Sequence, residues 1–301
     1  MPNHIIAIPN SSGLAAFIGK KGSENSITFY NRSVDGNIVT VLAPTSVADK
    51  FYALSEILTI SDAIVLSTEN LDKLFGELVI AAKLLGKKVL LTPENADSEI
   101  ISNAKLENSS VCEKEALLDA ILALKPRGGE NGSCRVDIDK AFDVKGIGAV
   151  ALGFVMDGII NVHDELWHSS GRKVLVRSLQ SQDIDVKSAA PGTRIGIGLK
   201  NIESDVIEKG SILHAVQHVQ HKRLKIRATL TEINKEHIET GKFYGFGSNF
   251  SYAMAKIEEV NGDTITLALE KPLSIFVGDG CLLVREALPR IFAAGKVTEL
   301  L

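Results

Sequence analysis

Cysteines are scarce in this chain of 301 residues, and long apolar runs are missing. The three cysteines, Cys112, Cys134 and Cys281, are far apart and odd in number. That argues against a disulfide framework or a paired-cysteine metal site and suits a reducing cytoplasm. No apolar run approaches the roughly eighteen residues of a membrane-spanning helix, so we expect no membrane partner. The N-terminal MPNHIIAIP lacks a basic segment before an apolar stretch, so we expect no signal peptide.

A strong excess of either charge is also lacking. The formal net charge is −4, with the excess of acidic residues in the N-terminal part and a nearly neutral C-terminal part. Any contact with nucleic acid would therefore depend on a local basic patch. Hydrophobic residues make up 45% of the chain, enough to build the cores of two or three domains.

The N-terminal part alternates between two kinds of segment. Short apolar runs typical of buried strands lie at His4–Pro9, Asn37–Leu42, Ala63–Ser67 and Lys88–Thr92. Apolar residues at helical spacing lie at Val47–Leu58, Leu71–Leu85 and Glu113–Leu124. Gly86 and Gly19 are placed to end helices, and Gly19 is followed by two lysines that we expect to face solvent. This alternation predicts an α/β domain over residues 1–128, with helices covering a parallel sheet.

The pattern changes after Lys125–Ser133, a segment rich in glycine and polar residues that is typical of a linker. Short β-type runs then follow at intervals of about eight to twelve residues, separated by Gly, Asp and Asn. Such spacing predicts two small antiparallel β-barrels, over residues 134–215 and 217–301. Asp137, Asp139 and Asp143 alternate with apolar neighbours, which predicts an exposed strand edge.

The stretch AFDVKGIGAVALGFVMDGIINVHDELW, residues 141–167, resembles the second domain of translational GTPases. The matching positions are Lys145, Gly146, Gly148, Val150, Gly153, Val155, Gly158, Ile160, Asp164 and Glu165. Ala149 and His163 depart from the Thr and Gly usual in the family. The segments RSLQ and GTRIGIGLKNI that follow are similar to the selenocysteine-specific branch of the elongation factor Tu-like family.

Residues 217–301 resemble the third domain of the same family. The matching positions are Leu269, Pro272, Gly278, Asp279 and Arg285, while Gly280 replaces the usual Arg. The resemblance implies a GTPase-like α/β domain followed by two antiparallel barrels. Glycines such as Gly148 and Gly153 suit the bends and bulges of a small barrel.

The segments that would bind GTP in this family have lost their characteristic residues. The loop after the first strand, Asn10, Ser11, Ser12 and Gly13, lacks the lysine of a phosphate loop. Ala43–Ser46 stands where the resemblance places a DxxG segment and has no carboxylate for Mg²⁺. Thr92–Asn95 stands in place of the guanine-reading NKxD. The sequence therefore predicts a pseudo-GTPase domain that is not an enzyme and uses neither GTP nor Mg²⁺.

The resemblance implies a protein of translation that binds tRNA, the ribosome or another translation factor without GTP hydrolysis. A divergent GTP-binding elongation factor and a protein-interaction scaffold are the alternatives. Candidate RNA contacts are Lys222, Arg223, Lys225 and Arg227, because alternation with apolar residues would align the last three on one face of a strand. A plain solvated strand face is the other interpretation of this row.

His214, His218 and His221 lie close together in the sequence, and on a helix they would share a face. The residues that follow alternate as in a strand, and no cysteine or carboxylate nearby completes a site. We therefore expect a polar joint between the barrels here and no metal.

Overall fold

The computed structural model describes residues 3–45, 51–125, 127, 129, 131–230, 238–286 and 290–301. Ser46, the start of the predicted helix Val47–Leu58 and linker residues 126, 128 and 130 lie outside these ranges. The chain forms two compact units. The first contains Met1–His4, Ser33–Ile38 and Lys125–Gln220, and the second contains Ile5–Arg32, Val39–Leu124 and His221–Leu301. The three predicted domain boundaries stay predictions.

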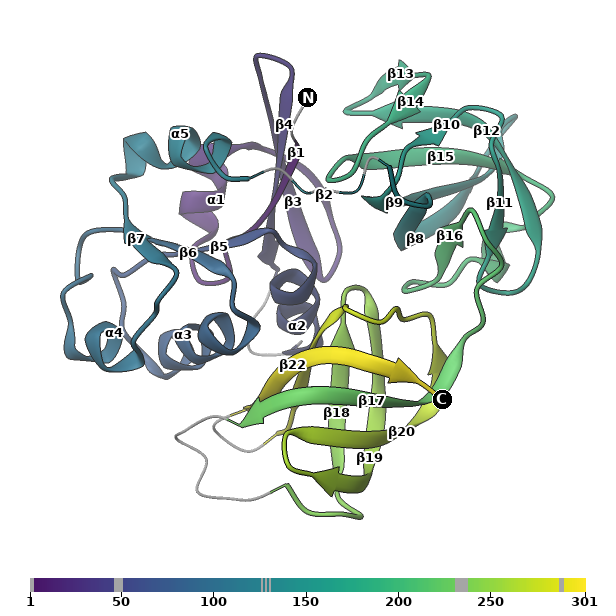
Figure 1. Cartoon of the computed structure of the whole chain (residues 1–301). Helices are drawn as coiled ribbons and strands as arrows, with labels where there is room; N and C mark the ends of the chain where they lie inside the picture. The colour runs from purple at the N-terminus through teal and green to yellow at the C-terminus, as the bar shows by residue number, and fades with distance from the viewer. Residues whose placement is uncertain are drawn as a thin grey trace. The chain divides into compact units, whose positions relative to one another are not determined.

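The N-terminal sheet has seven strands in the order β2-β3-β4-β1-β5-β6-β7 (Figure 1). The strands are β1 Asn3–Ala7, β2 Lys20–Glu24, β3 Ile27–Val34, β4 Asn37–Pro44, β5 Ala63–Leu66, β6 Lys88–Leu91 and β7 Ser109–Val111. Strands β1, β5, β6 and β7 are parallel, but β2 and β3 are antiparallel. The sheet is therefore mixed, and the prediction of a parallel sheet was wrong for the side formed by β2 and β3. A tight turn at Asp35 and Gly36 joins β3 to β4. Both residues have positive φ (49° and 79°), which suits a two-residue hairpin loop between antiparallel strands.

Helices accompany this sheet as the periodicity predicts. They are α1 Ser12–Ile18, α2 Phe51–Ile60, α3 Lys73–Leu85, α4 Glu99–Ala104 and α5 Leu117–Leu122, with a 3₁₀ turn at Lys114–Ala116. Helix α3 begins at an Asp72 cap that accepts a hydrogen bond from the Phe75 N–H and ends at Gly86 in the left-handed conformation (φ 63°). Gly19 ends α1 as predicted, and the exposed Lys20 and Lys21 lie on strand β2.

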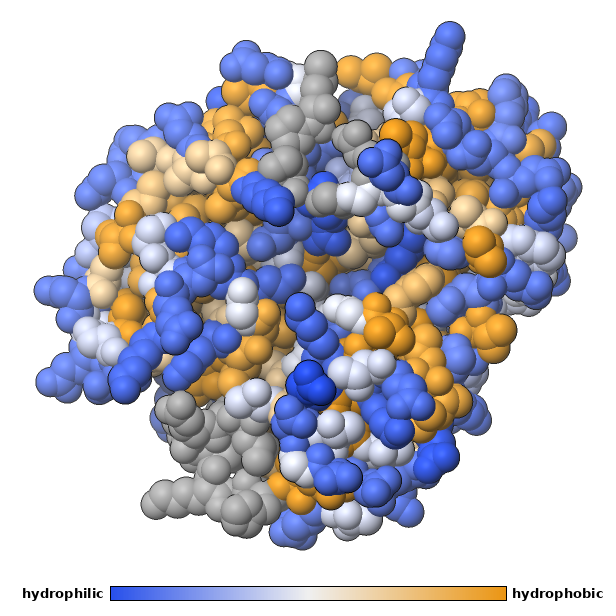
Figure 2. Space-filling view, viewed as in Figure 1, coloured by the Kyte–Doolittle hydropathy of each residue, from blue (hydrophilic) through white to orange (hydrophobic). Residues whose placement is uncertain are grey.

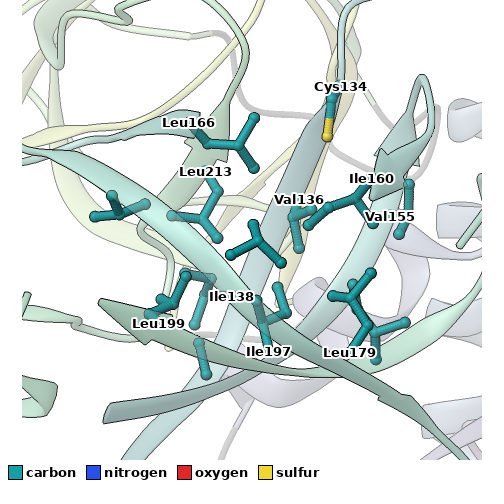
Figure 3. Close-up of a cluster of buried hydrophobic side chains, with 14 of the residues drawn as sticks. Cys134, Val136, Ile138, Val155, Ile160, Leu166, Leu179, Ile197, Leu199 and Leu213 are labelled. Atoms are coloured by element: carbon teal, nitrogen blue, oxygen red, sulfur yellow. The ribbon is translucent and has the colours of Figure 1, made fainter. Parts of the chain in front are cut away.

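The first barrel is a closed antiparallel sheet. Six strands, β11-β16-β8-β9-β15-β12, close through pairing of β11 with β12, and β13 extends β12. The strands are β8 Arg135–Val144, β9 Gly148–Asp157, β10 Ile160–Asn161, β11 Glu165–His168, β12 Lys173–Ser181, β13 Ile184–Val186, β14 Ser188–Ala189, β15 Arg194–Lys200 and β16 Ile212–His214, with a 3₁₀ turn at Ser204–Val206. Figure 3 shows side chains such as Val136, Ile138, Val155 and Ile197 filling its interior.

Two aspartates of β8 are buried in this barrel, which corrects the prediction of an exposed edge. Asp137 is 4% exposed and receives two hydrogen bonds from Arg135, at 2.7 and 2.8 Å. Asp139 is 3% exposed and pairs with Arg194 at 3.0 Å, and its burial raises its pKa against the opposing effect of that arginine. The register of β8 shifts between Ile138 and Lys140. Asp139 is therefore the extra residue of a β-bulge in this strand.

The second barrel is also closed, in the order β17-β20-β19-β18-β21-β22. The strands are β17 His221–Leu230, β18 Phe243–Ser248, β19 Ser251–Asn261, β20 Thr264–Leu273, β21 Gly280–Val284 and β22 Ile291–Leu300. Its core includes Phe246 and a stacked pair of rings, Tyr244 and Phe292, whose centroids lie 4.4 Å apart. The two closed barrels and the α/β sheet confirm the predicted fold class.

Helices α2 and α3 pack directly on the second barrel, within one compact unit. The buried Glu77 of α3 accepts hydrogen bonds from the N–H and the Nε of Arg290, at 2.8 and 3.2 Å. Thr59 of α2 accepts one from the N–H of Asn249 at 2.8 Å. A side chain at Gly247 would overlap the hydroxyl of Ser55. A glycine is therefore required for this close approach of helix and barrel.

Hydrophilic residues cover most of the face shown in Figure 2, with hydrophobic residues in small groups between them. Within the described part of the chain, none of the helices has the length and apolar character needed to cross a membrane.

The pair of Glu77 and Arg290 gives a first prediction. Replacing Glu77 with Ala leaves two donors of Arg290 without their acceptor, so we expect a loss of about 2–3 kcal/mol of unfolding free energy. Urea unfolding followed by the circular dichroism of the α-helices measures this, because all α-helices of the described ranges belong to the same unit. The control Glu77→Gln keeps an acceptor for the Arg290 N–H and should lose less. Equal stability of the Glu77→Ala and unaltered chains would contradict the assignment.

The buried His168 leads us to predict that the stability of the first barrel depends on pH. Burial, with a smaller contribution from Arg172, lowers the pKa of His168 from 6.5 to about 4. Between these values the unfolded chain binds a proton that the folded chain does not, so stability falls as the pH drops from 6.5 toward 4. Above pH 6.5 the titration of His168 no longer changes the stability with pH.

The variant His168→Asn tests this dependence. Asparagine does not titrate there and can still accept the hydrogen bond that the Ser170 N–H donates to Nδ1 at 3.1 Å. Urea unfolding monitored by fluorescence of Trp167, the single tryptophan, should show a weaker pH dependence than in the unaltered chain. Identical pH profiles for the two proteins would rule out His168 as the cause.

Candidate functional site

The carboxyl ends of β1, β5 and β6 meet at one edge of the N-terminal sheet. In open α/β sheets this edge is where ligands bind, and here the sequence predicts a degenerate nucleotide site. The residues that follow the three strands are Asn10 after β1, Ser67 and Thr68 after β5, and Thr92–Asn95 after β6. These segments hydrogen-bond to one another.

Asn10 joins the first of these loops to the second. Its side-chain amide donates to the carbonyl of Ser67 at 2.7 Å, and its carbonyl oxygen accepts from the Ser67 N–H at 3.1 Å. The next residue, Ser11, caps α1 by accepting from the Leu14 N–H at 3.2 Å. Ser12 and Gly13 are exposed and already belong to the first turn of α1. Half of the predicted remnant loop therefore lies in helix α1, and the four residues 8–11 connect β1 to α1.

Thr68 joins the second loop to the third. Its N–H donates to the Thr92 hydroxyl at 2.9 Å, and its own hydroxyl donates to the Thr92 carbonyl at 2.8 Å. Asn95 donates from its side chain to the Thr68 carbonyl at 2.8 Å. The hydrogen bond from Thr92 is the largest of several effects that hold the pKa of Glu94 below its ordinary value, and Thr68 and Lys114 add to it.

We call Asn10, Ser67, Thr68, Thr92, Glu94 and Asn95 the edge network. Its members contribute amides, hydroxyls and one carboxylate, and none contributes a cation. Donors and acceptors of the three loops are directed at each other. Thr45, where the resemblance places the metal-binding segment, donates its hydroxyl to the Asn25 carbonyl at 2.8 Å. The sequence missed Thr68 and Ser67, and the only signal for them was their place directly after a buried strand.

The predicted basic row lies on β17 with the expected alternation. Lys222, Arg223 and Arg227 are exposed, and Lys225 is half-buried between the buried Leu224 and Ile226. Three of the four cations face carboxylates on neighbouring chain segments. The ion pairs are Arg223 with Glu258 at 2.5 Å, Lys225 with Glu299 at 2.7 Å and Arg227 with Asp263 at 3.2 Å. The row is thus a ladder of ion pairs, which is a weaker candidate for an RNA contact than its sequence suggests.

The three histidines do not share a helix. His214 ends β16 and His221 begins β17, while the rings of His214 and His218 lie 6.4 Å apart. In the part of the chain that the structure describes, no group of three or more His, Cys, Asp or Glu side chains is arranged to hold a metal.

The edge network gives a further prediction. Replacing Asn10 with Ala removes both hydrogen bonds to Ser67, and we expect a loss of about 1–3 kcal/mol in unfolding free energy. Hydrogen exchange should report it most directly, as faster exchange of the Ser67 amide. The control Ser12→Ala alters an exposed residue and should change stability by less than about 0.5 kcal/mol. Unchanged protection of Ser67 in the Asn10 variant would contradict the network.

Comparison with known proteins supports the resemblance. Residues 148–214 match the family model of elongation factor Tu domain 2. Over 295 residues the chain is 28% identical to an uncharacterized protein of Methanocaldococcus jannaschii, covering 95% of this chain and 96% of that protein. It is 26% identical over 217 residues to the selenocysteine-specific elongation factor of the same organism, covering 62% of this chain and 45% of that factor. With that of Escherichia coli it shares 32% identity over 132 residues, covering 43% and 21%.

Solved structures agree in fold. The elongation factor SelB of Methanococcus maripaludis in its apo form superposes with a TM-score of 0.81 at 18% identity, covering 99% of this chain and 80% of SelB. The same factor in complex with the GTP analogue GPPNHP gives a TM-score of 0.82 at 17% identity, covering 100% and 79%.

Sequence and fold together relate the chain to the elongation factor Tu-like family of translational GTPases, with the sequence match to its domain 2 at residues 148–214. It is an elongation factor-like protein that is related in sequence to selenocysteine-specific elongation factors and shares the fold of SelB. The chain spans less than half the length of the selenocysteine-specific factors that it matches in sequence.

Proposed function

We propose that this protein binds tRNA, the ribosome or another translation factor without binding or hydrolysing GTP. The observation that carries the proposal is the edge network, which uses Asn10, Thr68 and Asn95 to join the loops where the family binds its nucleotide. A nucleotide would have to replace these internal hydrogen bonds, and Leu14 stands directly after Gly13, where a phosphate loop has its lysine. The proposed protein therefore has no GTP or Mg²⁺ cofactor and no catalytic residues.

The packing of α2 and α3 on the second barrel supports a role without a switch. The resemblance places α2 directly after the degenerate DxxG segment. Here α2 is held on the barrel through Thr59 and Asn249, and α3 through Glu77 and Arg290. A ligand shifts an equilibrium only by its difference in affinity for two states, and without nucleotide no such ligand acts on these helices. We propose that they keep one arrangement on the barrel.

The proposed place of action is the cytoplasm. Cys112, Cys134 and Cys281 are all free thiols. Burial raises the pKa of Cys134 to about 12, and burial also raises that of Cys281. Such thiols are unreactive and suit a reducing compartment.

A titration of the purified protein with fluorescent GTP and GDP, with and without Mg²⁺, tests the proposal. We expect no saturable signal up to millimolar nucleotide and no GTP-dependent phosphate release, because the edge network leaves no phosphate cradle. An archaeal SelB under identical conditions is the positive control. Tight binding that requires Mg²⁺ would overturn the proposal and favour a divergent GTP-binding factor.

A further inference from the structure

A groove of about 700 Å³ lies between the C-terminal end of α3 and the second barrel, within one compact unit. Its walls come from the α3 end at Leu84–Lys87, from β17 and β22, and from the turn before β21. The charged residues that line it are all basic: Lys87, Arg227 and Lys296. Four glycines also line it, so a ligand can approach the main chain closely.

A second groove of about 330 Å³ lies on the other side of the same α3 end and shares Gly86 and Lys87 with the first. Its other charged residues are Lys83, Lys105 and Glu107. Cations therefore outnumber carboxylates along both grooves. This surface was not visible in the sequence, because its lysines come from helices and strands far apart in the chain.

The cations of the two grooves differ in their partners. Lys87 donates to the carbonyl of Thr59 at 3.0 Å, a structural contact at the end of α2, and Arg227 is paired with Asp263. Lys105 and Lys296 are exposed, and across the described ranges neither forms an ion pair. This separates them from the β17 row, whose Arg223 and Lys225 each face a carboxylate.

The negative end of the α3 dipole accounts for lysines in its last turn, such as Lys83. It gives no reason for Lys296, which lies on a strand, or for a lining without carboxylates in the larger groove. Exposed lysines that have no carboxylate partner retain their full charge for an external anion, whereas a paired cation first has to leave its carboxylate.

We infer that the two grooves form a binding surface for the phosphate backbone of RNA. The inference rests on the nucleotide-independent binding role proposed above and names RNA as the partner. RNA fits better than an acidic peptide, because cations recur on both sides of Gly86 and a nucleic acid carries regularly repeated charges. Lys105 and Lys296 supply the contacts, and Arg227 adds one when Asp263 releases it.

The test measures the affinity of the full chain for a fluorescein-labelled duplex RNA by anisotropy, without nucleotide, between about 50 and 200 mM salt. The variant Lys105→Ala/Lys296→Ala should bind about tenfold more weakly at low salt, and its salt slope should fall by about one for each lysine. The matched control Arg223→Ala/Lys225→Ala removes the same number of cations from the paired row. It should bind within about twofold of the unaltered chain. Asp263→Asn, which frees Arg227, should strengthen binding.

Three outcomes would overturn the inference: an equal loss in the control pair, unchanged affinity in the lysine variant, or displacement of the RNA by polyglutamate as readily as by unlabelled RNA. An equal loss in the control pair would place the RNA contact on β17. Displacement by polyglutamate would identify an acidic protein partner. RNA binding that requires added GTP would overturn the proposed function while leaving this surface intact. The two failures are therefore distinguishable.

Discussion

The N-terminal sheet depends on how its loops satisfy the main-chain groups at the carboxyl ends of β1, β5 and β6. Donors and acceptors that leave a buried strand need partners, and a nucleotide-binding sheet leaves many of them for the ligand. Here Asn10 supplies partners to both the N–H and the carbonyl of Ser67, and Thr68 and Asn95 do the same for the next loop. These hydrogen bonds join the three loops to one another, and the four residues 8–11 connect β1 to α1.

Helices α2 and α3 likewise hydrogen-bond to the second barrel. Thr59 receives the N–H of Asn249 and Glu77 receives two donors of Arg290. A rearrangement of α2 or α3 would expose these partly buried polar groups together. In a switch protein the energy for such a step comes from a ligand that binds the two states differently. In this chain, helices α2 and α3 and the last barrel supply hydrogen-bond partners to one another.

Elements with strong local signals were predictable from the sequence. Helix α3 has a complete set: an Asp72 cap, apolar residues at helical spacing and Gly86 at its end. The barrels followed from glycine-punctuated β-type runs. Strand β2 was missed because KKGSE has no apolar pattern and serves only as an exposed edge. That polar edge, with the Asp35–Gly36 hairpin beside it, made the sheet mixed.

Features built from distant residues could not be predicted. Asp139 looked exposed because its partner Arg194 lies 55 residues away, on another strand. The contact of Asn10 with Ser67 spans 57 residues and has no local signal. The four basic residues of β17 were found, with the correct alternation. Their carboxylate partners, Glu258, Asp263 and Glu299, become visible only when the barrel closes.

The ladder of ion pairs on β17 also determines the electrostatic field of this strand away from the protein surface. Three of its four cations, Arg223, Lys225 and Arg227, sit next to an opposite charge, so the fields of these pairs largely cancel within a few ångströms of the surface. Beyond the Debye length, about 8 Å at physiological ionic strength, the electrostatic field of these ion pairs is largely screened. The three paired cations of this strand therefore add little to the steering of a nearby polyanion. In surroundings crowded with RNA, strand β17 can therefore carry paired arginines and lysines without attracting nonspecific polyanions.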